Sequence, residues 1–138
     1  MRPAQRTVAI GAVSGVVSML VALSLLTPRM PAPPAGAAVA ERIAFALRWD
    51  ALAVIPILLA VVAVGNGRAL SEAIDPLAGK ESRAMIINGR VVDNGVQQFV
   101  IFLMATLALA ASEGARMGMV SAGAVLFIAA RLVFWIGY

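Results

Sequence analysis

The 138-residue sequence contains neither cysteine nor histidine. The first absence excludes disulfide bonds and thiol nucleophiles, and the second excludes histidine ligation of haem or zinc and imidazole as a general base. We therefore expect no metal and no haem. Any reaction at this protein would need a reactive group supplied by a cofactor or a substrate.

Charged residues are also scarce, at 13% of the chain, whereas 62% of the residues are hydrophobic and the mean hydropathy is +0.94. This composition predicts an integral membrane protein. Each span needs about 20 residues, so the chain has room for about four spans and for no separate soluble domain. The net charge of +4 is spread over the predicted loops. It favours contact with membrane lipids and argues against nucleic-acid binding.

Four apolar stretches predict an all-α, four-span helical bundle that forms one transmembrane domain over residues 1–138. The predicted spans cover residues 7–27, 40–65, 83–111 and 117–137. Pro28–Ala37 contains four prolines and predicts an extended loop. Gly65-Asn66-Gly67 is expected to end the second span, which we read as one uninterrupted helix. Ser112–Arg116 predicts a tight turn.

The first span follows two arginines and contains Gly11 and Gly15, a spacing that favours close helix packing. The alternative is a secretory signal peptide, because Ala38-Val39-Ala40 resembles a cleavage site. The apolar core is longer than the roughly 7 to 15 residues of a signal peptide. This length favours a membrane span.

Several polar or unusual residues have a structural interpretation. Arg48 and Asp50 are expected near a membrane boundary, where snorkelling or pairing would satisfy them. Trp135 and Tyr138 are typical of interfacial anchors. Gly95 costs about 1 kcal/mol relative to alanine inside a helix, which indicates close packing or a ligand against the backbone.

The third span begins with a stripe of polar side chains. On a helix with 3.6 residues per turn these side chains share one broad face: Arg83, Arg90, Asp93, Asn94, Gln97 and Gln98. Each such group is costly in hydrocarbon unless it is paired. We therefore expect the stripe to face protein or a hydrated cavity, and we treat it as a candidate site.

The third and fourth spans are expected to form an antiparallel pair about a turn near Gly114. That geometry places Arg131 opposite Gln97 and Arg90 level with Tyr138. Two arginines, an amide stripe and a tyrosine hydroxyl would then converge and suit an anionic guest with carboxylates or a thiolate. The alternative is an internally satisfied network in which Asp93 pairs with either arginine.

Basic residues give a small asymmetry between the two sides. Five lie on the amino-terminal side and four on the other: Arg2, Arg6, Arg68, Lys80 and Arg83 against Arg29, Arg42, Arg48 and Arg116. By the positive-inside rule, the amino terminus and the polar cluster are cytoplasmic. We expect a bacterial inner membrane.

Two motifs resemble those of the superfamily of membrane-associated proteins in eicosanoid and glutathione metabolism (MAPEG). The first is R-x-x-x-N-x-x-[EQ]-x-x-x-x-F, here Arg90, Asn94, Gln97 and Phe102. The second is the ending A-R-L-x-[FY]-x-x-G-Y, here Ala130, Arg131, Leu132, Phe134, Gly137 and Tyr138. With the helices that carry them, the motifs cover about the last ninety residues.

The resemblance implies a helical-bundle subunit in a homotrimer, with glutathione bound between neighbouring subunits near the cytoplasmic face. Arg90, Asn94, Arg131 and Tyr138 match family positions that hold glutathione. In the family the nucleophile is glutathione's own sulfur, held as a thiolate by a nearby cation. That chemistry needs positioning and charge rather than an acid–base residue.

The sequence also departs from the family pattern. Gln97 stands where glutathione-active members have glutamate, and Gln98 stands where they have tyrosine. The family usually continues past the Gly-Tyr ending into a helix preceded by an arginine proposed to stabilise the thiolate, whereas this sequence stops at Tyr138. Binding without turnover is therefore one of the open hypotheses.

Two functions follow from these observations. The first is a glutathione-dependent transferase or peroxidase that acts on lipophilic electrophiles. The second is a noncatalytic membrane protein that binds lipid or docks as an accessory subunit on a larger membrane complex. A transporter is less favoured, because four short helices without a repeat or a broken helix do not match that architecture.

Overall fold

The computed structural model describes residues 2–137, and every regular element within them is helical. The long helices are α1 (Pro3–Leu26), α2 (Val39–Ala53), α3 (Ile55–Ala69), α4 (Arg83–Ala111) and α5 (Gly118–Ile136). Short 3₁₀ turns occur at η1 (Thr27–Arg29), η2 (Glu72–Ile74) and η3 (Pro76–Ala78). Four of the helical stretches, α2 and α3 counting as one, are long and apolar enough to cross a membrane. The expected all-α bundle with four spans is confirmed.

Helix α4 has the bounds of the predicted third span, and both ends have a local cause. The Ser82 hydroxyl accepts a hydrogen bond from the backbone N–H of Met85 at 3.3 Å, which caps the first turn. At the other end the chain turns through Gly114, whose φ of 69° is left-handed and suits glycine. The Ser82 cap and the turn at Gly114 therefore set the bounds of α4.

The second span is not one uninterrupted helix, so that expectation was wrong. The chain bends at Val54, between α2 and α3. Pro56 is the cause, because it has no N–H to donate to the carbonyl four residues earlier. The expected stop at Gly65-Asn66-Gly67 was also wrong, since α3 continues to Ala69. Gly67 instead leaves room for Met85 of α4, whose Cγ would lie 2.9 Å from an added Cβ.

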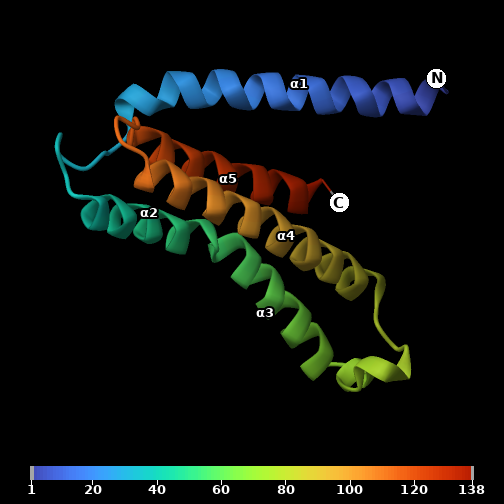
Figure 1. Cartoon of the computed structure of the whole chain (residues 1–138). Helices are drawn as coiled ribbons and strands as arrows, with labels where there is room; N and C mark the ends of the chain where they lie inside the picture. The colour runs from blue at the N-terminus through green and yellow to red at the C-terminus, as the bar shows by residue number, and fades with distance from the viewer. Residues whose placement is uncertain (1, 138) are drawn as a thin grey trace.

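The helices run back and forth along one direction (Figure 1). Helices α4 and α5 form an antiparallel hairpin, α2 and α3 pack against α4, and α1 runs beside α5. Both described chain ends and residues 70–82 lie toward one end of the bundle, which we call the terminus end. The connections 27–38 and 112–117 lie at the other end, which we call the proline end.

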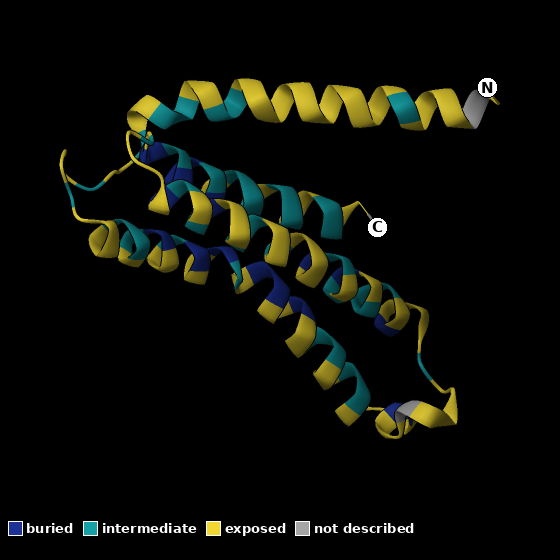
Figure 2. Ribbon diagram, viewed as in Figure 1, coloured by how far each residue is buried: buried dark blue, intermediate teal, exposed yellow. Residues whose placement is uncertain are grey.

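The core lies toward the proline end (Figure 2), and most of its buried apolar side chains are alanine. Its central cluster is Ala46, Ala110, Met117 and Val120. Small side chains let helix backbones approach closely, which is how membrane helices commonly associate. Helix α1 is different, because none of its most apolar 18-residue window is buried. Its contacts with the other long helices are chiefly with α5.

Candidate functional site

Arg131 of α5 makes the polar contact between α4 and α5 at the candidate site. Its Nη1 donates to Asn94 Oδ1 at 2.7 Å, and its guanidinium lies 5.5 Å from the ring centre of Phe127 and 5.2 Å from that of Phe134. The cation–π contacts and the amide bond together hold the half-buried side chain in place. Its Nε is buried and has no partner within residues 2–137. Arg131 therefore keeps an unused donor.

The register of the α4–α5 hairpin differs from the expected one by about one helical turn. Arg131 meets Asn94 rather than Gln97, and Trp135 Nε1 donates to Asn88 Oδ1 at 2.9 Å in a matching register. The midpoint of the antiparallel hairpin therefore lies at the end of α4 and not at Gly114. Trp135 was expected to be an interfacial anchor, and here it also bonds the two helices together.

Arg90 lies on another flank of α4, beside α3. It lines a groove of 380 Å³, the Arg90 groove, together with Arg68, Glu81 and Asp93. Arg68 and Glu81 form a salt bridge at 2.5 Å. This pair was not predicted from the sequence, although Glu81 directly precedes the Ser82 cap of α4. Within residues 2–137 the carboxylate of Asp93 forms no ion pair, so the predicted Asp93 network is not observed.

Arg131 lines a different cavity, the Arg131 groove, of 320 Å³. Gln98 of α4 and Phe127 of α5 form part of its wall. Helix α1 supplies Met19, Leu20 and Leu23, a contribution that was not predicted from the sequence. The two arginines do not converge on one cavity within this chain, contrary to expectation.

The polar stripe of α4 is largely on the outside of the chain. Arg90, Asp93, Gln97 and Gln98 are exposed, whereas Asn94 is half-buried. The buried side of the helix carries Met85, Val91, Gly95, Thr106 and Ala110. Gly95 is needed there for packing, since an added Cβ would lie 3.0 Å from Ile57 Cγ1. The candidate residue Tyr138 lies outside the described residues.

A separate polar pair is buried between α2 and α4. The Thr106 hydroxyl lies 2.9 Å and 3.1 Å from the two carboxyl oxygens of Asp50, whose exposed fraction is 2%. Asp50 therefore pairs inside the bundle and does not snorkel to a membrane boundary, while Arg48 is exposed. No role for Thr106 was predicted from the sequence, because one threonine in an apolar helix forms no recognisable pattern.

The arrangement offers more hydrogen-bond donors than acceptors around α4, which suits an anionic molecule. Within residues 2–137, no three Asp or Glu side chains gather in a group that could hold a metal ion. Comparisons of the chain with protein-family models, with curated proteins and with solved structures gave no match.

Proposed function

We propose that this protein is a membrane subunit that binds glutathione along the polar face of α4, between copies of itself. One observation carries the proposal: four polar side chains of a membrane-spanning helix, Arg90, Asp93, Gln97 and Gln98, are exposed on the single chain. Polar groups inside a bilayer face protein or water because hydrocarbon cannot satisfy them. A neighbouring copy and a bound anion would supply what the single chain lacks.

The two arginine-lined grooves and the polar face of α4 between them support an anionic ligand. Arg90 and Arg131 would hold carboxylates through charge-assisted hydrogen bonds, and Asn94 and Gln97 would bond the peptide groups of the ligand. The resemblance of these positions to the MAPEG motifs points to glutathione and to three copies. In this proposal glutathione releases its thiol proton to water, and a guanidinium offsets the thiolate charge. The sulfur then forms a bond to the carbon of a lipophilic electrophile that enters from the bilayer, while the electron pair of the broken carbon–leaving-group bond departs with the leaving group.

The proposed orientation places the amino terminus and the polar face of α4 on the cytoplasmic side of a bacterial inner membrane. Its support is the excess of basic residues at the terminus end, where Arg68, Lys80 and Arg83 lie. Glutathione is a cytoplasmic solute, so this orientation agrees with the proposed ligand.

Binding of glutathione to the purified protein in nanodiscs tests this function. We expect Arg90→Ala to weaken affinity about tenfold, because one charge-assisted contact contributes roughly 1.5 kcal/mol or more. Arg116→Ala is the control: it removes the same charge from an exposed position at the proline end and lines neither the Arg90 groove nor the Arg131 groove. Absence of binding to the unmodified protein, or equal loss in both variants, would rule the proposal out.

A second function, that of an accessory subunit in a larger membrane complex, is favoured by α1. An added Cβ at Gly11 or Gly15 would meet nothing within 4 Å, so this face of the helix is open to another membrane protein. Chemical cross-linking in native membranes separates the two functions. Cross-links only between copies of this chain would count against the accessory role.

A further inference from the structure

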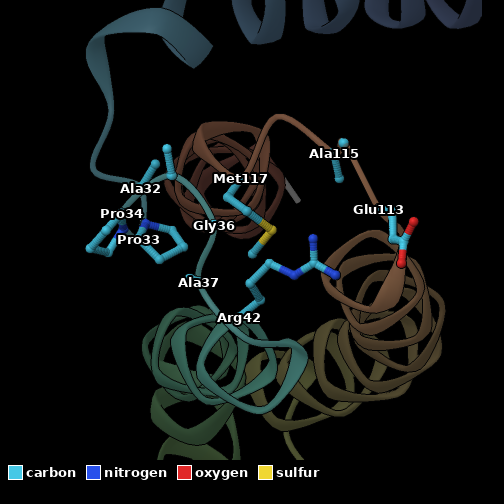
Figure 3. A pocket seen from close by; sticks show the side chains of 11 residues that line it. Ala32, Pro33, Pro34, Gly36, Ala37, Arg42, Glu113, Ala115 and Met117 are labelled. Atoms are coloured by element: carbon cyan, nitrogen blue, oxygen red, sulfur yellow. The ribbon is translucent and has the colours of Figure 1, made fainter.

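A third cavity lies at the proline end, away from both α4 grooves, and has a volume of 390 Å³. One wall is the proline-rich connection, including Pro33, Pro34 and Gly36, and the other includes Glu113 and Met117. Arg42 of α2 reaches into the space between them, as Figure 3 shows. Neither the polar face of α4 nor the proposed function uses this cavity.

The walls of this cavity are fixed by local structure. The Ser121 hydroxyl of α5 donates to the carbonyl of Pro31 at 2.6 Å and so ties the connection to the bundle. Gly36 and Gly114 border the cavity with φ of 80° and 69°, left-handed values that form the turns on its two sides. Because prolines restrict the backbone as well, the cavity is preformed.

The Arg42 guanidinium leaves most of its hydrogen-bond donors without a partner in this cavity. Its Nη2 makes one long contact of 3.5 Å with the carbonyl of Ala111, and its buried Nε has no partner within residues 2–137. Glu113, the carboxylate on the facing wall, forms no ion pair with it. A guanidinium presents five donors in a planar fork that matches the oxygens of a phosphate. The cavity therefore offers directed donors that no side-chain acceptor engages within residues 2–137.

The position of the cavity agrees with a membrane-surface ligand. It lies where α2 begins, α4 ends and the chain turns into α5. Ends of membrane-spanning helices lie at the level of the lipid headgroups, where phosphate is abundant. The amino-terminal turn of α2 is not expected to attract an anion to the cavity, because the Glu41 carboxylate already accepts from the backbone N–H of Ala38 at 3.0 Å.

We propose that this cavity binds a phosphate group, with Arg42 as its cationic ligand and a phospholipid headgroup as its source. A free phosphate ester offers the same chemistry, so the test needs both sources. Dissociation constants are measured by titrating the detergent-solubilised full chain with short-chain phosphatidylglycerol and, separately, with glycerol phosphate.

Arg42→Gln is expected to weaken phosphatidylglycerol binding about tenfold, because it removes the charge-assisted bonds. Glu113→Gln is expected to tighten it about two- to threefold by removing a repelling charge. Arg48→Gln is the matched control, since Arg48 is exposed on the same helix and does not line this cavity. If Arg42→Gln fails to fold, Arg42→Lys and Glu113→Gln provide the test, with a weaker and a tighter complex expected.

Each outcome has a defined meaning. Arg42-dependent binding of phosphatidylglycerol but not of glycerol phosphate supports the lipid site. Arg42-dependent binding of glycerol phosphate with equal affinity would overturn the lipid source. Equal affinities for the unmodified chain and Arg42→Gln would overturn the site, as would equal losses in Arg42→Gln and Arg48→Gln, which indicate only general surface charge.

Discussion

Gly118→Ala is expected to destabilise the bundle by about 2–3 kcal/mol, the upper part of the range for overpacking. An added Cβ at this first residue of α5 would lie 2.3 Å from the backbone carbonyl oxygen of Thr27. A backbone atom cannot rotate away as a side chain can. Either α5 or the turn after α1 must therefore move.

Gly65→Ala is the matched control, because an added Cβ at this helical glycine meets nothing within 4 Å. There the substitution should stabilise the helix by about 0.5–1 kcal/mol, since alanine loses less backbone freedom on folding. Reversible unfolding in mixed detergent micelles measures both free energies. Equal stability of the two variants would mean that α5 does not pack against Thr27 in the membrane.

Thr106→Val is expected to destabilise the protein by about 1–2 kcal/mol. Valine keeps the shape of threonine but leaves the buried carboxyl of Asp50 without its side-chain partner, and such unsatisfied groups are costly. The loss should be confined to the contact of α2 with α4, because Thr106 and Asp50 lie on those helices. The same unfolding experiment in mixed micelles measures it.

Two further variants separate the polar contact from packing. Asp50→Asn keeps a side chain that can bond to Thr106 and should stay near the stability of the unmodified chain. The double change of Asp50→Leu with Thr106→Val should recover part of the loss, because removing both buried partners costs less than removing one. A double variant less stable than Thr106→Val alone would contradict this role of the pair.

The fold class could be predicted from the sequence because hydrophobic length decides it. Apolar stretches separated by a proline-rich loop and two polar connections leave few architectures other than a helical bundle in a membrane. The bounds of α4 follow from two local signals, the Ser82 cap and the glycine at 114. The break before α3 was also present in the sequence, because Pro56 cannot complete the helical ladder.

The candidate site was harder to predict because it depends on which side of α4 packs inward. The polar stripe covers nearly half of the circumference of α4, and the sequence does not indicate which edge of the stripe contacts α5. Asn94 lies at the packed edge and bonds Arg131, whereas Gln97, one turn along, lies outside. The buried side is instead set by Gly95 and by the fit of Ile57 against it, a detail of shape that periodicity does not contain.

Helix register also depends on where α4 ends. The turn after Ala111 brings the start of α5 back toward α4 sooner than a turn centred on Gly114 would. One helical turn of difference moves Arg131 from Gln97 to Asn94. A small shift in the position of a loop therefore changes which residues meet at the site, while the fold class stays the same.

The most direct test asks what the polar face of α4 meets in the bilayer. Because the chain has no cysteine, Gln97→Cys and Val96→Cys each give one site for a nitroxide label; Val96 is the apolar control, 48% exposed at the same depth but about 100° around the helix from Gln97 and outside the polar stripe. We predict that oxygen, which concentrates among acyl chains, collides much less with the label at 97 than with the label at 96. Equal collision rates would place Gln97 against lipid and contradict the proposed site.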